Sequence, residues 1–259
     1  MKPKLHFNAV ALTDIGRQSD HNEDTVFCEI SEQKTAALLI VADGMGGHLA
    51  GEHASQMVVE TIVETMRPWL DKEDLPPSEQ LQEEVQQGLL TAVQQANQAV
   101  YSYAEENLAY GVHMGSTVAC AFLHQDIAYI ANVGDSRVYL YRQEHLHRIT
   151  EDHSLVERFV QEGIITDQDR FDHDVRNVIT RAIGPKSAVA VDLFACDLEA
   201  GDCLLLCSDG LWEMLRGEES VYLQNKSDLA ERTQNLINAA NQAGGEDNIS
   251  AILAQCLAA

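Results

Sequence analysis

Long apolar runs and basic residues are what this sequence lacks most clearly. No stretch approaches the roughly 20 apolar residues of a membrane-spanning helix, and no apolar segment like that of a secretory signal follows Met1-Lys2-Pro3-Lys4. We therefore expect no membrane partner and a cytoplasmic location. Lysine and arginine number 17 against 41 aspartate and glutamate, a formal net charge of −24. Such a surface repels nucleic acid, which excludes it as a partner, and it repels phosphate esters unless bound cations reverse the sign locally.

Paired cysteines are also missing. The six cysteines form no CxxC pair and no even framework, and most lie inside apolar, strand-like runs. This usage is typical of buried, reduced thiols in the core of a cytoplasmic protein, and it argues against a thiol-held metal site.

Acidic residues follow several apolar runs directly. Two runs end in Asp-Gly, at Asp43 and Asp209, and a third ends one glycine before Asp135. Carboxylates are costly to hold against an apolar core unless a cation meets them. We therefore predict one shared cation site at the mouth of a sheet, an arrangement typical of hydrolases, although Asp-Gly is also common in ordinary turns. Oxygen ligands without paired histidines or thiols indicate Mg²⁺ or Mn²⁺ rather than Zn²⁺.

Hydrophobic periodicity predicts grouped strands and long helices rather than a strict βαβ repeat. Pro68 is expected to stop the first helix, Ser78 to cap the second, and Gly244-Gly245 to end the last. The predicted helices are 50–66, 81–103, 154–162 and 228–242. The predicted strands are 5–12, 24–30, 35–42, 116–124, 127–133, 136–142, 176–183, 188–195, 203–208 and 249–257.

This grouping favours α+β layers over a doubly wound sheet. Residues 163–175 carry acidic turns without periodicity and are predicted to form an exposed flap. Residues 71–77 read as a charged connector within one of the layers. Because nothing resembles an interdomain linker, we expect residues 1–259 to form a single domain.

Several short segments, taken together and in order, are highly specific. They are Asn22-Glu23-Asp24, Val41-Ala42-Asp43-Gly44-Met45-Gly46-Gly47-His48 with Gly51-Glu52, Gly115-Ser116-Thr117, Asn132-Val133-Gly134-Asp135-Ser136-Arg137, Thr150-Glu151-Asp152-His153-Ser154, Ser208-Asp209-Gly210 and Glu246-Asp247-Asn248. With these motifs the chain resembles the metal-dependent, type 2C serine/threonine protein phosphatases over nearly its whole length. The Met-Gly-Gly-His version of the first loop is similar to the compact bacterial branch of that family.

The resemblance implies an α-β-β-α sandwich of two antiparallel sheets flanked by helix pairs, with a binuclear Mn²⁺ or Mg²⁺ site in its cleft. The ligands it implies are Asp43 bridging both metals, the Gly44 carbonyl, Asp209 and Asp247 on the second metal, Glu23 through a water, and Asp135 for a third, weaker metal. Two cations about 3.5–4 Å apart activate a water and stabilise in-line phosphoryl transfer, so no nucleophilic side chain is needed. The implied activity is hydrolysis of phosphoserine and phosphothreonine on proteins. Its implied partners are phosphoprotein substrates, including a cognate kinase or its targets, and we expect a monomer.

Two further residues are candidates for catalysis and substrate binding. His48 is a candidate for proton transfer to the leaving oxygen, and the alternative is that it packs at the start of the following helix. The family usually places a phosphate-binding arginine where this chain has Ser19. Arg17, two residues earlier, would lie on the same face of a strand and is a candidate phosphate ligand, unless it is a solvated surface residue.

Other functions were weighed against this prediction. His48 and His53 superficially match helical zinc motifs, but residues five apart diverge by about 140° on a helix, which excludes a zinc peptidase. A catalytically weak or dead relative that serves as a phosphoprotein-binding regulatory module is the alternative, and the missing arginine at Ser19 favours it. The full set of metal carboxylates argues against it. A phosphatase of small esters or nucleotides has little support, because no base-binding motif is apparent.

Overall fold

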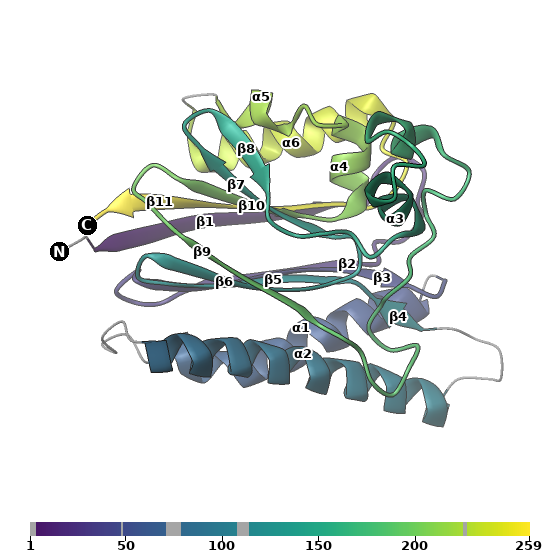
Figure 1. The fold of residues 1–259 in the computed structure, drawn as a ribbon, viewed down its shortest axis with the longest axis horizontal. Helices are drawn as coiled ribbons and strands as arrows, with labels where there is room; N and C mark the ends of the chain where they lie inside the picture. The colour runs from purple at the N-terminus through teal and green to yellow at the C-terminus, as the bar shows by residue number, and fades with distance from the viewer. Residues whose placement is uncertain (1–3, 48, 71–78, 108–113, 225–226) are drawn as a thin grey trace.

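The computed structural model describes residues 4–47, 49–70, 79–107, 114–224 and 227–259 (Figure 1). The predicted connector 71–77, the predicted cap Ser78 and the candidate acid His48 lie outside these described residues. Within them, no helix is both long enough and apolar enough to cross a membrane.

Two antiparallel sheets lie face to face at the centre of the molecule (Figure 1). The strands are β1 (Leu5–Asp14), β2 (Asp24–Ile30), β3 (Ala36–Met45), β4 (Gly115–Ser116), β5 (Val118–His124), β6 (Ile127–Val133), β7 (Arg137–Arg142), β8 (His145–Arg148), β9 (Asp192–Asp197), β10 (Cys203–Cys207) and β11 (Ile249–Ala258). One sheet has the order β1-β11-β10-β7-β8, and the other has the order β2-β3-β5-β6-β9 with β4 paired to β3.

Helices cover the outer face of each sheet (Figure 1). The helices are α1 (Leu49–Leu70), α2 (Glu79–Asn107), α3 (Leu155–Gln161), α4 (Asp209–Leu215), α5 (Glu219–Leu223) and α6 (Leu229–Ala243), with a short 3-10 turn, η1, at Gln168–Asp172. The pair α1 and α2 packs on the sheet that contains β3, and α4 to α6 pack on the sheet that contains β11. The predicted α+β sandwich of two antiparallel sheets with flanking helices is therefore confirmed.

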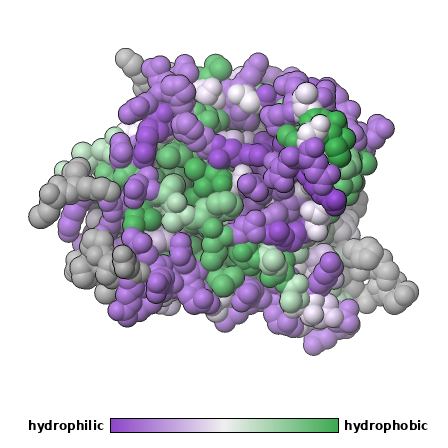
Figure 2. Space-filling model, in the orientation of Figure 1, coloured by the Kyte–Doolittle hydropathy of each residue, from purple (hydrophilic) through white to green (hydrophobic). Residues whose placement is uncertain are grey.

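The alternation of side chains along β3 shows why its sequence is continuously apolar. Leu38 and Ile40 face the core under α1 and α2, whereas Leu39 and Val41 face the core between the sheets. A strand buried on both faces needs apolar residues at every position. Figure 2 shows that the surface on this side is mainly hydrophilic, with hydrophobic residues gathered near its middle.

Some predicted elements differ from the structure. Helix α1 continues past Pro68 to Leu70, because the proline removes only a bond in the last turn while Met66 and Leu70 remain packed in the core. Segment 176–183 is not a strand, and its β-pairing is limited to isolated bridges at Ile179 and Ile183. The strand predicted at 188–195 begins later, at Asp192. Strand β8 and helices α4 and α5 were not predicted.

Two errors affect the functional predictions. Strand β1 ends at Asp14, and residues 16–18 form a turn, so strand alternation does not place Arg17 and Ser19 on one face. The flap predicted at 163–175 is not wholly exposed either. Arg170 and Phe171 are buried, with 2% and 8% of their surfaces exposed.

Candidate functional site

Acidic side chains from several strand ends meet at one end of the sandwich. We call Asp24, Asp43, Asp135, Asp209 and Asp247 the acidic cluster. The register of β2 and β3 places Asp24 opposite Asp43, and Asp209 begins α4 directly after β10. Burial raises the pKa of Asp43 well above its usual range, and the charges of the other four members raise it further. Because such repulsion requires proximity, residues that are remote in sequence share one site.

Asp209 and Asp135 are the members with unsatisfied oxygens. Burial raises the pKa of Asp209 well above its usual range, and the nearby charges of Asp135 and Asp247 add to the shift. Burial also raises the pKa of Asp135 to about 7, with Asp152 and Glu213 as the nearest repelling charges. The Oδ1 atoms of Asp135 and Asp209 are buried and have no hydrogen-bond partner among the described residues. A buried carboxylate oxygen left in this state is suited to a cation.

Asp24 is a member that the sequence motifs contained but to which we gave no role. Only 8% of its surface is exposed, and Ser208 Oγ donates a hydrogen bond to its Oδ2 at 2.7 Å. Burial raises its pKa to about 7, against the lowering effect of hydrogen bonds from Ser250 and Ser208. In the motif Ser208-Asp209, Ser208 therefore donates a hydrogen bond to Asp24, and Asp209 is itself a member of the acidic cluster.

Glycines bring Glu23 close to the cluster. A Cβ atom at Gly51 would lie 1.8 Å from Glu23 Oε2, and one at Gly44 would lie 2.0 Å from the carbonyl oxygen of Gly51. The Gly44 N–H donates to the Glu23 carbonyl at 3.1 Å. No larger residue fits at either glycine, which explains in physical terms why Asp43-Gly44 is followed by Gly51 at this spacing.

Asn248 ties together the loops that carry the site. Its Nδ2 donates to the carbonyls of Ile15 and His21, both at 2.9 Å, and its Oδ1 accepts from the Glu23 N–H at 2.7 Å. Asp247 is exposed, and its Oδ1 accepts from the Asn248 N–H at 2.7 Å. The buried Asn248 side chain thus fixes the loop before β2 against the segment that presents Asp247.

Replacement of this side chain should destabilise the protein. Asn248→Ala removes three hydrogen bonds and leaves a buried N–H and two carbonyls to find other partners, so we expect a loss of about 3 kcal/mol in the free energy of unfolding. Urea unfolding measures it. Asn238→Ala, on the surface of α6, is the matched control. A loss below about 1 kcal/mol would contradict this role of Asn248 in joining the loops, because that is the net value of a single hydrogen bond.

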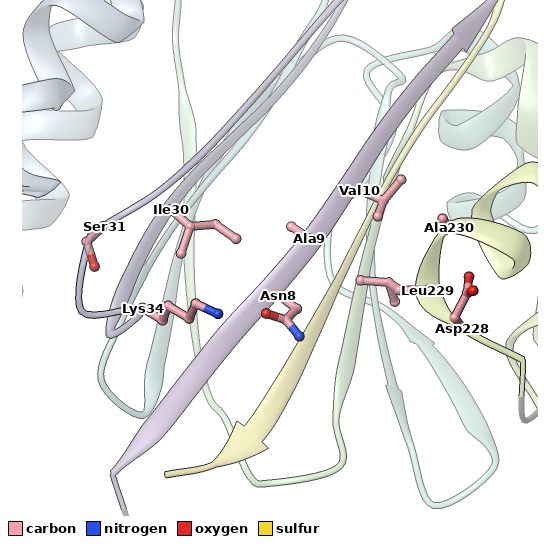
Figure 3. A pocket seen from close by; sticks show the side chains of 9 residues that line it. All are labelled: Asn8, Ala9, Val10, Ile30, Ser31, Lys34, Asp228, Leu229 and Ala230. Atoms are coloured by element: carbon pink, nitrogen blue, oxygen red, sulfur yellow. The ribbon is translucent and has the colours of Figure 1, made fainter.

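A small cavity opens beside the cluster. Its volume is about 140 Å³, and its lining includes Asp209, Asp247, Glu213, Glu246 and Arg176. Arg176 Nη2 lies 3.1 Å from Glu246 Oε2, and its Nε lies 3.5 Å from Glu213 Oε2. A larger hollow of about 550 Å³, between Asn8, Lys34 and Leu229, contains no member of the cluster and is therefore not the candidate site (Figure 3).

Hard cations fit these donors. The cluster offers carboxylate oxygens, two of them unpartnered, in a setting where ionisation is disfavoured until positive charge is present. Among the described residues, no three His, Cys, Asp or Glu side chains are already arranged as a metal cage. The case for cation binding therefore rests on the raised pKa values of the clustered carboxyl groups and on the unpartnered oxygens of Asp135 and Asp209.

The predicted substrate ligand Arg17 lies at the edge of this region. Its side chain is exposed, and its N–H donates to the Gly245 carbonyl at 2.8 Å. Ser19 is half-buried in the same loop. Gln18, between them, lines the cavity beside the cluster. The loop therefore reaches the site, although the Arg17 side chain is not among the lining groups.

Comparisons with known proteins give a consistent result. The sequence model of the Protein phosphatase 2C family matches residues 15–255. The serine/threonine phosphatase stp of Listeria innocua is 39% identical over 246 residues, which cover 94% of this chain and 93% of that protein. The solved S. agalactiae serine/threonine phosphatase superposes with a TM-score of 0.84 at 34% identity, over 96% of this chain and 99% of that one. The catalytic domain of the phosphatase PstP, solved in complex with two manganese ions, superposes with a TM-score of 0.80 at 32% identity, over 98% of this chain and 99% of that one.

Proposed function

Because the chain belongs to the protein phosphatase 2C family and is a metal-dependent serine/threonine protein phosphatase, we propose that the acidic cluster is its catalytic centre. The observation that carries this proposal is the raised pKa of Asp43, to which the charge of Asp209 contributes, although Asp43 lies on β3 of one sheet and Asp209 follows β10 of the other. Its substrates are phosphoproteins, and we propose that they include a cognate kinase or the targets of that kinase.

The proposed ligands of two Mn²⁺ or Mg²⁺ ions are Asp43, the Gly44 carbonyl, Asp209, Asp247 and, through a water, Glu23, with Asp135 serving a third ion. The PstP relative holds two manganese ions, which supports this number. When bound, such ions supply an activated water and neutralise the charge of the transferring phosphoryl group. Ser208 holds Asp24 in the cluster by a hydrogen bond, and the close approach of Gly44 to Gly51 leaves room for the Glu23 carboxylate beside it.

The cysteines give no support to a thiol nucleophile. All six are free, and Cys28 and Cys196 are the half-buried ones. Burial raises the pKa of each of these two thiols to about 11. They stay protonated near neutral pH and are therefore poor nucleophiles. Direct attack by water on the phosphorus remains the chemistry that the site supports. We further propose that the chain acts as a monomeric, single-domain cytoplasmic enzyme.

Turnover of a phosphothreonine peptide tests this function. Hydrolysis that requires Mn²⁺ and stops with EDTA would support the catalytic reading. Folded protein that binds Mn²⁺ and the phosphopeptide without hydrolysing it would favour the regulatory module instead. Turnover of nucleotides or small esters at higher kcat/KM than the peptide would favour a small-ester phosphatase.

Ser19→Arg should improve capture of the substrate phosphate. A guanidinium at this half-buried loop position would add a bidentate, charge-assisted contact, and we expect KM for the phosphopeptide to fall about tenfold. Steady-state kinetics measure it, with Ser19→Met as the uncharged control. An unchanged or higher KM would count against the idea. Arg17→Ala tests the other candidate, and an unchanged KM there would leave Arg17 as a surface residue.

A further inference from the structure

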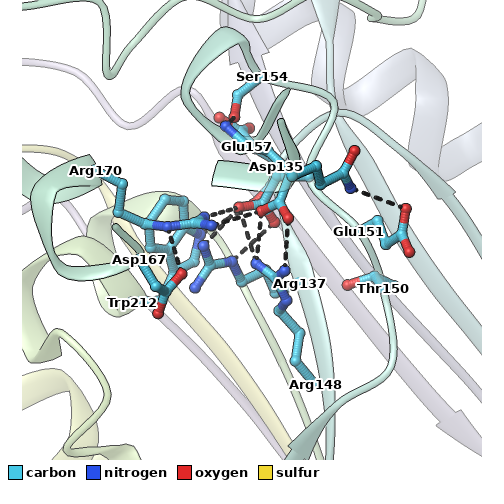
Figure 4. A network of polar contacts seen from close by, with 12 residues as sticks. Asp135, Arg137, Arg148, Thr150, Glu151, Ser154, Glu157, Asp167, Arg170 and Trp212 are labelled. Carbon is cyan, nitrogen blue, oxygen red and sulfur yellow. Dashed lines mark hydrogen bonds and ion pairs between the residues drawn. The ribbon is translucent and has the colours of Figure 1, made fainter. Parts of the chain in front are cut away.

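A buried network of arginines and carboxylates lies beneath the flap (Figure 4). Arg170, on η1, is less exposed than the arginines Arg137 and Arg148, with 2% of its side-chain surface exposed. Its Nη1 donates to Asp152 Oδ2 at 2.9 Å, and its Nη2 donates to Glu157 Oε2 at 2.8 Å. Its Nε lies 2.9 Å from Asp167 Oδ1 but without the alignment of a hydrogen bond. The flap therefore reaches into the protein through one long side chain.

The acceptors of Arg170 are fixed by other arginines. Arg137 Nε donates to Asp152 Oδ1 at 2.9 Å, and Arg148 donates to both oxygens of Glu157, each at 2.9 Å. Burial alone would raise the pKa of Asp152, but the guanidinium groups of Arg137, Arg148 and Arg170 lower it. Both carboxylates thus present charged, oriented oxygens to the flap and keep a cationic partner if Arg170 is removed.

The same network touches the acidic cluster. The Arg137 guanidinium lies over the Trp212 ring, 3.4 Å from its centroid, and Trp212 Nε1 donates to the Asp135 carbonyl at 3.0 Å. Phe171, next to Arg170 on the flap, lies with its ring centroid 6.2 Å from that of Trp212. Trp212 belongs to α4, which Asp209 begins. The buried end of the flap is therefore packed against elements that carry cluster members.

The residues that directly follow the flap form a wall of the cavity. Arg176 and Asn177 line it together with Asp209 and Asp247. Only a few residues separate Arg170 from this wall, and two local backbone hydrogen bonds connect them, a long one from His173 N–H to Arg170 O (3.5 Å) and one from Arg176 N–H to His173 O (3.0 Å). The position of the wall thus depends on where Arg170 is held.

We propose that Arg170 is a positioning residue whose buried ion pairs hold residues 166–177 as a fixed wall of the cleft. A phosphorylated polypeptide meets more of this wall than a small phosphate ester does, because its flanking residues extend beyond the cavity that Arg176 and Asn177 share with Asp209. Arg170 therefore contributes to the preference for phosphoproteins. This role rests on the proposed function of the acidic cluster, but the docking of the flap does not.

Hydrogen exchange and kinetics of Arg170→Met test this role. We expect the amide exchange rates of residues 166–177, measured without substrate, to rise by at least about tenfold, because the segment loses its buried anchor. We expect kcat/KM for a phosphothreonine peptide to fall by about tenfold, chiefly through KM, while that for p-nitrophenyl phosphate changes less than about twofold. Arg170→Lys should restore much of the protection. Arg158→Met, at an exposed arginine of α3 whose side chain is 68% exposed, is the matched control.

Unchanged exchange in Arg170→Met, or an equal fall for the peptide and the small ester, would overturn the proposal. If that variant does not fold, Glu157→Gln weakens the same anchor and should raise exchange of the flap by a smaller factor, and no rise would overturn it. A wild-type protein that hydrolyses neither substrate would refute the proposed function, and the exchange data would then decide the docking of the flap alone.

Discussion

Asp209→Asn is expected to lower phosphopeptide turnover in Mn²⁺ by at least about 10³-fold while the fold stays intact. The substitution keeps the shape of the side chain but removes a negative charge at the start of α4. Asp209 has a buried, unpartnered oxygen, and its pKa is raised by burial and by the charges of Asp135 and Asp247. A neutral amide there cannot provide the charge that two divalent cations require, so both cation binding and chemistry should fail together.

Two measurements decide this prediction. Steady-state turnover of the peptide gives the loss of activity, and calorimetric titration with Mn²⁺ gives the loss of binding. Asp197→Asn, at the exposed end of β9, is the matched control and should behave as wild type. A variant that keeps more than a tenth of wild-type activity would place the catalytic centre away from Asp209.

The same variant should be more stable than wild type when metal is absent. Removing one of several mutually repelling carboxylates relieves repulsion that the folded state bears and the unfolded chain does not. Lower activity combined with a higher melting temperature in EDTA separates a functional loss from a folding defect. It also shows that stability has been given up at this site for function.

The sequence predicted the main carboxylates because their signal is local. Asp43 and Asp209 stand where apolar runs stop at Asp-Gly, a dipeptide also common in turns, so it was their joint occurrence with the other segments that indicated a cation site. The grouping of strands and helices likewise followed from periodicity, so the sandwich was predicted correctly. Pro68 misled because the proline rule describes the middle of a helix, whereas α1 has only its last turn to lose.

The features that were missed depend on contacts between remote segments. Asn248 acts through carbonyls of the loop before β2, more than 200 positions away, and no local pattern shows such hydrogen bonds. Arg170 stands among acidic residues that indicate an exposed turn, yet its partners come from the strand-to-helix connection at Asp152 and from α3. Strand alternation was used to place Arg17 on the same face as Ser19. That rule holds only within a strand, and β1 ends at Asp14, before both residues.

Charge is distributed unevenly around the proposed catalytic centre. The acidic cluster gathers negative charge at one end of the sandwich, while Arg137, Arg148 and Arg170 exceed in number the buried carboxylates Asp152 and Glu157 that they bind. Among the groups that act on Asp135, Arg137 lowers its pKa and Asp152 raises it. The Asp152 carboxylate acts on Asp135 more strongly than the Arg137 guanidinium does, so the network leaves the pKa of Asp135 raised.

Stability without metal should fall as the pH rises from about 4 to 7, and Mn²⁺ should reverse this trend. Burial raises the pKa of Asp24 and of Asp135 from 3.8 to about 7. In that interval the folded protein binds more protons than the unfolded chain, so the free energy of unfolding decreases with pH. A rise of this size corresponds to about 4 kcal/mol for each carboxyl group, so the total loss is on the order of several kcal/mol.

The pKa of Asp152 is shifted in the opposite direction, and its protonation limits the stability of the fold at acid pH. Its pKa is lowered by the arginines despite burial, so its stabilisation is present above the unfolded value and is lost as the pH falls below about 4. Urea unfolding in EDTA across about pH 2 to 8 should therefore show a maximum near about pH 4. Near pH 7.5, Mn²⁺ at 100 times its dissociation constant should restore about 2.7 kcal/mol, because it favours the ionised carboxylates of the folded state.

A single substitution identifies the groups responsible for this pH dependence. Asp135→Asn removes one of the carboxyl groups whose pKa is raised and should reduce the slope between pH 4 and 7. Stability that rises steadily from pH 5 to pH 8 in EDTA would mean that the cluster is ionised at little cost. In that case the carboxylates would already be solvated or paired. They would not repel one another in the folded state, and the electrostatic argument for a metal at this site would fail.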